Sequence, residues 1–423
     1  MINSENKLYT TDKIKEKLIL VGIEQGTKNT NNSLDELEEL IKTAGAESVS
    51  KIIQKREHIH PAHYIGKGKI EELKFIINTY DATGIVCDDE LSPNQIKNLE
   101  KLLNIKIMDR TIVILDIFAS RASTNEGKIQ VELAQLKYRL SRLSGIGVSM
   151  SKLGGGIGTR GPGETKLETD KRHIKQKIIE LNKELKNIET HRQLLRNQRE
   201  KKGMPVISLV GYTNAGKSTL MNTLTNSNLF AENKLFATLD TTTRKTKLPN
   251  GSNILLTDTV GFIQKLPHTL IKAFKTTLDE LKYADILLHI VDSSNIELQE
   301  HINVVYKTLD ELKCNDKPIL TIFNKIDICN DSYPFLIDKK AQKTLKVSAK
   351  TGEGINDILI EIQEIIKSFK NPIKLLIPYN EGNIINYIHN KTEIIYEKHS
   401  ENGYIIKAYA NKEVENKLNL YKI

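Results

Sequence analysis

One eight-residue segment constrains the fold of this chain more than any other. Gly211–Ser218 reads GYTNAGKS and matches G-x-x-x-x-G-K-[ST] without a gap. The apolar stretch Val206–Val210 precedes it and the amphipathic stretch Thr219–Leu224 follows it, so the motif lies between an expected strand and an expected helix. Glycines let backbone N–H groups curl around phosphates, and the N-terminus of the helix adds partial positive charge. The segment therefore predicts a phosphate-binding loop in an α/β domain.

Three later motifs follow in the order typical of a guanine-nucleotide domain: Asp258–Gly261 after the apolar strand Ile254–Leu256, Asn324–Asp327 after Ile319–Phe323, and then Ser348–Lys350. The Asp327 carboxylate can accept both the N1–H and the 2-amino group of guanine, a pair of donors that adenine lacks. Lys325 would pack over the ring, and Ser348–Lys350 can contact the guanine O6. Because strand carboxyl ends share one edge of an open α/β sheet, we expect these motifs to meet there.

The phosphate end of this site needs a cation and charge-stabilising groups. Lys217 would reach the β- and γ-phosphates, the Ser218 hydroxyl would ligate Mg²⁺, Asp258 would hold a Mg²⁺-bound water, and the Gly261 N–H would meet the γ-phosphate. A threonine that senses the γ-phosphate and Mg²⁺ is expected within Phe236–Arg244. Spacing alone does not choose among the four candidates, Thr238, Thr241, Thr242 and Thr243.

The residue after Gly261 is Phe262, where many GTPases carry a Gln that orients the attacking water. A phenyl ring cannot orient water, so hydrolysis needs another group, a partner or rearranged solvent. We expect slow intrinsic turnover. Simple core packing is the alternative reason for a Phe here, and both can hold together.

Residues 121–203 have the pattern of two long helices. Apolar residues recur at spacings of four and three in both halves, with one interruption at Arg192: Ile129, Leu133, Leu136, Leu140 and Leu143, then Ile174, Ile178, Leu181, Leu185, Ile188 and Leu195. Each half has the narrow apolar seam of a coiled-coil helix. The pattern predicts an antiparallel hairpin whose connecting loop, Ser144–Gly163, is rich in glycine.

The pattern of elements divides the chain into four regions: 1–120, an N-terminal α/β domain; 121–203, the helical hairpin with its Gly-rich tip loop; 204–371, the nucleotide domain; and 372–423, a small α+β module. The predicted fold class is α/β, with the P-loop domain between the hairpin and the C-terminal module. The expected elements include strands Leu18–Gly22 and Gly84–Cys87, and helices Leu34–Thr43 and Lys69–Tyr80.

Charge and composition narrow the class of protein and of partner. The net charge is +9, and residues 165–203 alone carry 12 Lys or Arg against 6 Asp or Glu. A basic helix pair with a Gly-rich tip can enter a phosphate-lined groove, so we expect recognition of RNA shape and backbone. The three widely spaced cysteines argue against a disulfide framework and a zinc site. Apolar runs of about six residues are too short for a membrane span.

The sequence resembles the HflX family of ribosome-associated GTPases. The resemblance rests on the P-loop, on Phe236–Asp240 (FATLD), on Asp258–Phe262 (DTVGF) and above all on Gly155–Glu168 (GGIGTRGPGETKLE). Gly66–Lys69 and the stretch from Glu126 (EGKIQVELAQL) also fit the family's N-terminal domain. The family usually reads Leu-Asp-Pro-Thr where this chain has Thr241 in place of Pro, which loosens one constraint on that loop.

The resemblance implies a GTPase that binds the large ribosomal subunit and its rRNA with GTP and Mg²⁺, and that separates ribosomal subunits under stress. The widely spaced cysteines fit a reducing cytosol, and the short loop between the heptads favours pairing within one chain, so we expect a cytoplasmic monomer without DNA partner or stable membrane insertion. Because Phe262 supplies no water-orienting group, we expect the ribosome to stimulate hydrolysis. The resemblance also implies that Thr238 is the Mg²⁺-sensing threonine. The catalytic residues would be Lys217, Thr238 and Gly261, and the metal ligands Ser218 and Thr238. The predicted nucleotide site comprises Gly211, Tyr212, Thr213, Asn214, Ala215, Gly216, Lys217, Ser218, Phe236, Ala237, Thr238, Leu239, Asp240, Asp258, Thr259, Val260, Gly261, Asn324, Lys325, Ile326, Asp327, Ser348, Ala349 and Lys350.

Other functions fit the same motifs. A GTPase that assists assembly of the large subunit would bind precursor particles. A GTPase coupled to RNA modification would need a second catalytic site, and a scaffold that only retains nucleotide would not need intact Lys217, Ser218 and Asp258. His58, His60 and His63 form H-x-H-x-x-H, but Pro61 interrupts any helix that would align them on a metal.

Overall fold

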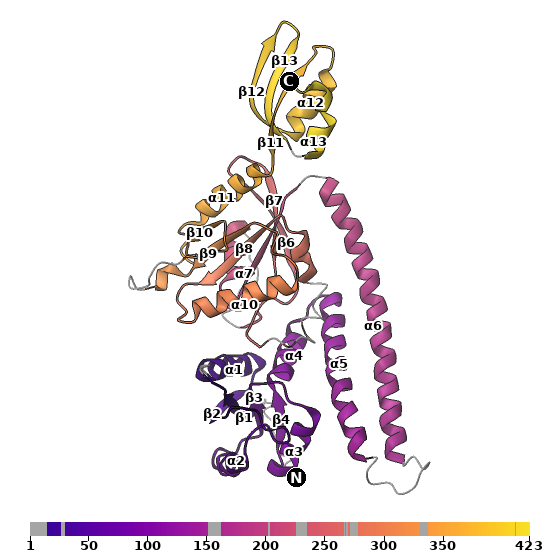
Figure 1. Cartoon of the computed structure of the whole chain (residues 1–423), viewed down its shortest axis with the longest axis vertical. Helices are drawn as coiled ribbons and strands as arrows, with labels where there is room; N and C mark the ends of the chain where they lie inside the picture. The colour runs from indigo at the N-terminus through magenta and orange to yellow at the C-terminus, as the bar shows by residue number, and fades with distance from the viewer. Residues whose placement is uncertain are drawn as a thin grey trace, which may run out of the picture.

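The computed structural model describes residues 15–26, 30–150, 162–201, 204–225, 235–265, 267, 270, 278–329, 337–410 and 412–423. The molecule is elongated (Figure 1). The N-terminal domain lies at one end, the C-terminal module at the other, and the nucleotide domain between them. Two long helices run along one side of the first two domains.

The N-terminal domain is a four-stranded parallel sheet with helices between the strands. Its elements are β1 (Lys17–Glu24), α1 (Thr30–Ala44), β2 (Glu47–Lys55), α2 (Lys67–Tyr80), β3 (Gly84–Cys87), α3 (Pro93–Leu103), β4 (Lys106–Asp109) and α4 (Arg110–Arg121). The strand order is β2-β1-β3-β4, and every neighbouring pair is parallel. Helix α3 begins as its sequence predicts, because Ser92 caps it in a reciprocal box with Gln95 and Pro93 occupies the first turn.

The predicted hairpin is present as α5 (Asn125–Met150) and α6 (Pro162–Lys201). The two heptad seams face each other, and Ile129 and Leu133 of α5 pack with Leu181 and Leu185 of α6. Arg192, which interrupts the second heptad, forms ion pairs at 2.7 Å with Glu126 of α5 and at 3.2 Å with Glu280 of the nucleotide domain. The seams therefore pair within one chain.

The connecting loop is shorter than the sequence predicts. Ser144–Met150, including Gly145 and Gly147, continue α5, and Pro162 already belongs to α6. The prediction of a loop from Ser144 was wrong at this end, because two isolated glycines within an established helix cost about 1 kcal/mol each and do not end it. The rest of the Gly-rich stretch, residues 151–161, lies outside the described residues.

The nucleotide domain is a six-stranded sheet with the order β10-β9-β8-β5-β7-β6, in which only β6 is antiparallel to its neighbour. Its described elements are β5 (Val206–Gly211), α7 (Lys217–Thr225), β6 (Thr242–Lys247), β7 (Asn253–Asp258), the 3-10 turn η1 (Asp279–Tyr283), β8 (Ile286–Asp292), α10 (Leu298–Glu311), β9 (Ile319–Asn324), the 3-10 turn η2 (Ile326–Ile328), β10 (Lys343–Lys346) and α11 (Ile355–Ser368). Strands β5, β8 and β9 are buried along almost their whole length, which explains their continuous apolar sequences.

The C-terminal module is an antiparallel sheet, β11 (Asn371–Ile377), β13 (Gly403–Ala410) and β12 (Glu393–Ser400), with β13 in the centre. Helices α12 (Gly382–Lys391) and α13 (Lys412–Lys417) lie on the same side of this sheet (Figure 1). The α/β fold class with its hairpin and small α+β module is confirmed. Within the described part of the chain, no helix is both long and apolar enough to cross a membrane.

Candidate nucleotide site

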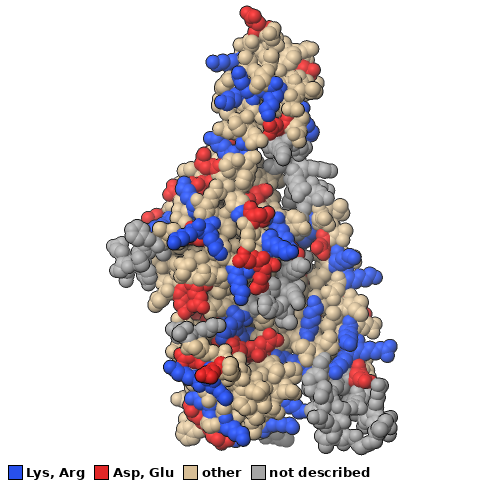
Figure 2. All heavy atoms as spheres, in the orientation of Figure 1, with Lys and Arg blue, Asp and Glu red and all other residues tan. Residues whose placement is uncertain are grey.

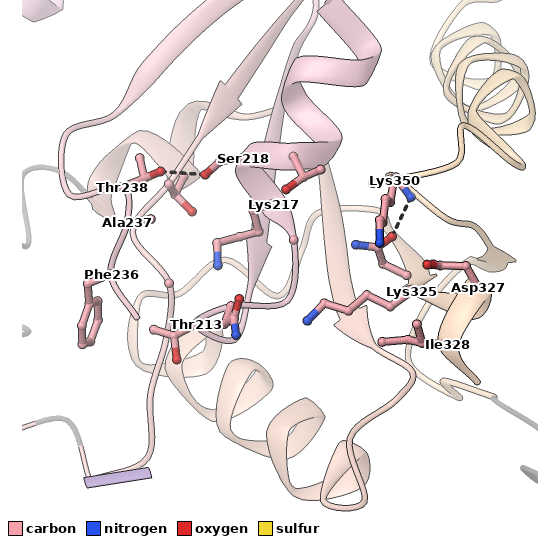
Figure 3. A pocket seen from close by; sticks show the side chains of 17 residues that line it. Thr213, Lys217, Ser218, Phe236, Ala237, Thr238, Lys325, Asp327, Ile328 and Lys350 are labelled. Carbon is pink, nitrogen blue, oxygen red and sulfur yellow. Dashed lines mark hydrogen bonds between the residues drawn. The ribbon is translucent and has the colours of Figure 1, made fainter. Parts of the chain in front are cut away.

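A cavity of about 520 Å³ opens at the carboxyl ends of the central strands of the nucleotide domain (Figure 3). Residues from all the predicted nucleotide motifs line it: Thr213, Asn214, Gly216, Lys217, Ser218, Thr219, Phe236, Ala237, Thr238, Thr259, Gly261, Asn324, Lys325, Asp327, Ile328, Ala349 and Lys350. The topology brings them together because β5, β7, β8 and β9 are parallel and end at one edge.

Two glycines around this cavity allow close approach of backbone and side chains. Gly216 has φ +93°, and a Cβ there would lie 2.3 Å from Nδ2 of Asn324. A Cβ on Gly261 would lie 2.9 Å from Nζ of Lys217 and 2.9 Å from Cα of Thr213. Glycine is needed at both positions, since a Cβ would collide with Asn324 at the first and with Lys217 and Thr213 at the second.

Lys217 is poised at the phosphate end of the cavity. Its side chain is buried, and Nζ donates hydrogen bonds to the carbonyl oxygens of Tyr212 at 2.7 Å and Gly211 at 3.2 Å. Burial lowers the pKa of Lys217 to about 8, although the nearby Asp258 carboxylate acts in the opposite direction. A buried ammonium group with carbonyls as its described hydrogen-bond partners gains most from an anionic ligand such as a phosphate.

Three oxygen-bearing side chains meet beside Lys217. The Ser218 Oγ lies 2.7 Å from Thr238 Oγ1 (Figure 3). It also donates to Asp258 Oδ2 at 2.8 Å. Asp258 is fully buried, and its Oδ1 atom has no hydrogen-bond partner. Burial raises the pKa of Asp258, while Lys217, Ser218 and Thr238 counter that effect. Hydroxyl and carboxylate oxygens around an unpaired buried oxygen fit a hard cation such as Mg²⁺ with bound water.

The opposite end of the cavity carries the predicted base-recognition residues. The Asn324 amide donates to the Ala215 carbonyl at 2.9 Å and accepts from the Ala349 N–H at 2.9 Å, so it ties two loops together. The Lys325 Nζ donates to Asp292 at 2.7 Å. The Ser348 Oγ donates to Asp327 Oδ1 at 2.7 Å, which orients that exposed carboxylate at the cavity.

Some predicted site residues do not line the cavity. The lining does not include Gly211, Ala215, Asp258, Val260, Ile326 and Ser348. Leu239 is buried in the apolar cluster that joins this domain to the N-terminal domain, and Asp240 accepts hydrogen bonds from Ser123 and Thr124. Phe236, Ala237 and Thr238 thus line the cavity, whereas the next two side chains, Leu239 and Asp240, contact the N-terminal domain and the residues before α5.

Two lining residues were not predicted. Thr219 and Ile328 each directly follow a predicted residue, Ser218 and Asp327. The signal for Ile328 was an apolar residue after the base-recognition motif, and this residue is 59% exposed. An exposed apolar side chain beside Asp327 suits the flat face of a base.

Phe262 packs into the core and does not reach the cavity. Its side chain is 2% exposed and contacts a cluster that includes Val210, Leu278 and Leu281. Its backbone is paired with the P-loop, since Thr213 N donates to the Phe262 carbonyl at 2.7 Å and Phe262 N donates to Gly211 at 3.1 Å. Core packing is therefore the structural role of this ring, and no water-orienting group comes from this side chain.

Replacing Phe262 with Gln should destabilise the protein without accelerating hydrolysis. The substitution leaves a cavity and buries an amide, and it should lower the free energy of unfolding by about 3–5 kcal/mol. Guanidinium unfolding measures the loss, and GTP turnover of the folded variant measures the rate. A faster variant of unchanged stability would contradict the packing role.

The loops around this cavity also contact the N-terminal domain. The Tyr212 hydroxyl donates to Glu36 and accepts from Gln264 N at 2.8 Å, and the Tyr212 ring stacks on His301 with centroids 3.6 Å apart. Phe236 packs edge-on against Phe118 of α4, with centroids 4.7 Å apart. The P-loop tyrosine therefore points away from the cavity and into the domain interface.

The loop after Gly261 makes a charged contact with the same domain. The Lys265 Nζ donates to Asp88 and, at 2.9 Å, to Asp89, both at the carboxyl end of β3. The buried Arg110 also pairs with Asp88 at 2.8 Å. Burial raises the pKa of Asp88, and Lys265 counters this effect. The carboxyl edge of the N-terminal sheet is thus occupied by a loop of the nucleotide domain.

The histidines at 58, 60 and 63 do not form a metal centre. His60 Nδ1 accepts hydrogen bonds from the N–H groups of Ala62 and His63, which fixes the turn before α2. Across the part of the chain that the structure describes, no group of three or more His, Cys, Asp or Glu is placed to hold a metal ion.

Comparison with known proteins matches the chain along its length. The family described as "GTP-binding GTPase N-terminal" matches residues 31–119, "GTP-binding GTPase Middle Region" matches 121–199, and "50S ribosome-binding GTPase" matches 206–325. The chain is 53% identical over 409 residues to "GTPase HflX" of Lacrimispora saccharolytica, covering 96% of both chains. It is 47% identical to "GTPase HflX" of Caldanaerobacter subterraneus, covering 96% of this chain and 93% of that one. A GDP-bound GTP-binding protein from Sulfolobus solfataricus is 26% identical with a TM-score of 0.42, covering 84% and 99%.

Proposed function

Since this chain belongs to the HflX family of GTPases, we propose that its nucleotide state controls binding to the large ribosomal subunit and separation of ribosomal subunits. The protein is a P-loop GTPase. The protein would act as a cytoplasmic monomer, in keeping with seams that pair within one chain. The four regions 1–120, 121–203, 204–371 and 372–423 would be its working domains.

The residues in and around the cavity divide into three roles. Lys217 would contact the β- and γ-phosphates, and the Gly261 N–H would meet the γ-phosphate as charge develops there. Ser218 and Thr238 would hold Mg²⁺ directly, and Asp258 would hold one of its waters. The bound ion would neutralise phosphate charge. Asp327 would select guanine, while Asn324, Lys325, Ser348 and Ala349 shape the base end of the cavity.

Hydrolysis would depend on the ribosome. Phe262 is in the core and does not orient water, so the free protein would turn over slowly until its partner orders the loops around Thr238 and Gly261. GTP would order these loops and hydrolysis would release them. These loops contact the N-terminal domain through Lys265 and Phe236. A change in loop conformation on hydrolysis would therefore change the position of the N-terminal domain and of the hairpin attached to it.

A basic stripe on α6 carries the proposal of an RNA partner. Arg172, Lys175, Lys183 and Lys186 fall within about 80° of one another on a helix that advances 100° per residue. All four are exposed, and the exposed Ile179 lies among them. The stripe faces away from the buried seam, and Figure 2 shows Lys and Arg side chains along the outer side of the helix pair. A row of cations on a rigid helix fits the phosphates of a ribosomal RNA groove.

Sedimentation tests the proposal directly. Intact ribosomes are mixed with the protein and GTP, a non-hydrolysable GTP analogue or GDP, and the particles are separated on a gradient. Splitting with GTP or the analogue, but not with GDP, supports the proposal. Ribosomes that stay intact while the protein travels only with immature large subunits would favour the alternative role in subunit assembly. No association in any nucleotide state would refute both roles.

Neutralising the basic stripe should weaken this association. The variant R172Q/K175Q/K183Q/K186Q should bind ribosomes at least about tenfold more weakly than the wild type. The negative slope of log affinity against log salt concentration should become less steep by about three, because four cations are lost. The matched control is E180Q/E184Q, which changes exposed acidic residues on other faces of α6. It should bind normally, and both variants should keep ribosome-free GTP turnover. If the stripe variant and the control bind ribosomes with equal affinity, the basic stripe of α6 is not part of the ribosome-binding surface.

A further inference from the structure

We propose that Asp240 is a positioning residue for GTP hydrolysis. Its side chain binds the N-terminus of α5 and thereby holds the segment that carries Thr238, so the hairpin and Thr238 would move together. This inference rests on the proposed role of Thr238 as the Mg²⁺-sensing residue, but not on the identity of the partner. It assigns Asp240 to the contact between two domains and removes it from the predicted nucleotide ligands.

The contact between Asp240 and α5 consists of four hydrogen bonds to two consecutive residues. Asp240 Oδ2 accepts from the Ser123 N–H at 2.9 Å, the Ser123 Oγ at 2.6 Å and the Thr124 N–H at 2.9 Å. Asp240 Oδ1 accepts from the Thr124 Oγ1 at 2.6 Å. Both carboxylate oxygens are engaged, so the side chain has one defined orientation relative to α5.

Helix physics favours a carboxylate at this place. Thr124 precedes the first residue of α5, and its Oγ1 accepts from the Gly127 N–H at 3.0 Å in the usual capping bond. The Asp240 carboxylate thus lies at the partly positive end of a 26-residue helix. Four donors surround this one carboxylate, which accepts through both of its oxygens, as an ionised carboxylate can.

Gly127 supplies an independent sign that the two segments need close contact. A Cβ at Gly127 would lie 2.2 Å from Asp240 Oδ1. Gly127 is in the first turn of α5, where alanine would otherwise suit the helix better. The glycine leaves room for a side chain that comes from 113 positions further along the chain.

The position of Asp240 in the sequence makes this contact relevant to Thr238. Thr238 touches Ser218 at the cavity, Leu239 is buried against the N-terminal domain, and Thr242 begins β6. Asp240 thus adds a polar contact to α5 between the buried Leu239 and the start of β6 at Thr242. Its four hydrogen bonds to Ser123 and Thr124 therefore limit the conformations of the segment between Thr238 and Thr242.

The experiment compares nucleotide discrimination across variants of the full chain. Asp240→Asn should lower kcat about tenfold and weaken a non-hydrolysable GTP analogue about tenfold, while GDP affinity stays within about twofold. The reason is that only the γ-phosphate state uses Thr238. The double variant S123A/T124A removes the two hydroxyl donors and keeps the two backbone N–H donors, so it should show the same pattern in weaker form. Adding it to Asp240→Asn should cause less than additive loss, because both changes act on the same contact.

Two further variants separate positioning from folding. Gly127→Ala leaves Asp240 intact and favours the helix, yet it should displace the carboxylate and reproduce the loss of analogue affinity. Glu132→Gln removes an exposed carboxylate of α5 and should leave kcat, both affinities and the Tm unchanged. Equal weakening of GDP and analogue, or unchanged analogue affinity in Asp240→Asn, would overturn the inference.

Thr238→Ala is the reference for the proposed site itself. If it discriminates normally between analogue and GDP, the proposed role of Thr238 is wrong. If Thr238→Ala loses discrimination but Asp240→Asn keeps it, the site stands and the positioning role of Asp240 fails. The two failures are therefore distinguishable in one set of titrations.

Discussion

Lys217→Met should reduce GTP turnover at least about 100-fold while leaving the nucleotide-free protein folded. The ammonium group is buried at the phosphate end of the cavity and would stabilise charge on the β- and γ-phosphates as the bond breaks. In the free protein, burial lowers the pKa of Lys217 to about 8, so its charge opposes folding at neutral pH. Removing the charge at similar side-chain volume should keep the Tm or raise it.

The measurement pairs steady-state turnover with thermal unfolding. Lys247→Met is the matched control, because Lys247 is exposed on β6 and outside the cavity. It should behave as the wild type in both assays. Wild-type turnover in Lys217→Met would mean that the phosphates bind elsewhere. A Tm well below that of the wild type would mean that the lysine supports the fold and not the ligand.

Asp327→Asn should exchange the base preference of the protein. The carboxylate would accept two donors of guanine, and charged hydrogen bonds contribute about 1.5–3 kcal/mol each, so GTP affinity should fall about 100-fold or more. Xanthine carries a carbonyl in place of the 2-amino group, and an amide can donate to it. The variant should therefore bind and hydrolyse xanthosine triphosphate better than GTP.

Competition titrations with both nucleotides check this exchange. Asp316→Asn, an exposed residue of the same domain, should retain the preference for GTP. Ser348→Ala removes the hydroxyl that donates to Asp327 at 2.7 Å, and it should weaken GTP without any gain for xanthosine triphosphate. Loss of both nucleotides in Asp327→Asn, with no change of preference, would argue against base selection by this residue.

The sequence was enough to predict the structure where a residue's role depends on its neighbours in the chain. The P-loop glycines, the capping box at Ser92 and the heptads of α5 and α6 all specify backbone shape within one or two turns of chain. Alternating strands and helices then require a parallel sheet, whose carboxyl edge gathers the nucleotide motifs. The fold class and most of the cavity lining could therefore be predicted.

The direction in which individual side chains point could not be predicted from the local sequence. Asp240 and Tyr212 lie in nucleotide motifs, yet their side chains turn to α5 and to Glu36. Phe262 has the expected position in the chain, but only the packing of Val210 and Leu278 around it shows that its ring fills the core. Similarly, Arg192 interrupts the heptad because it forms ion pairs with Glu126 and Glu280, which lie far away in the sequence.

The sequence by itself determined a P-loop domain with guanine motifs, a two-helix hairpin, an N-terminal α/β domain and a small C-terminal α+β module. Only the tertiary structure decided how they are joined: Lys265 with Asp88, Asp240 with Ser123 and Thr124, and Phe236 with Phe118. The physical reason is that periodicity and spacing encode hydrogen bonds and faces within an element. The partner of a side chain across a domain interface depends on how two independently formed cores pack together.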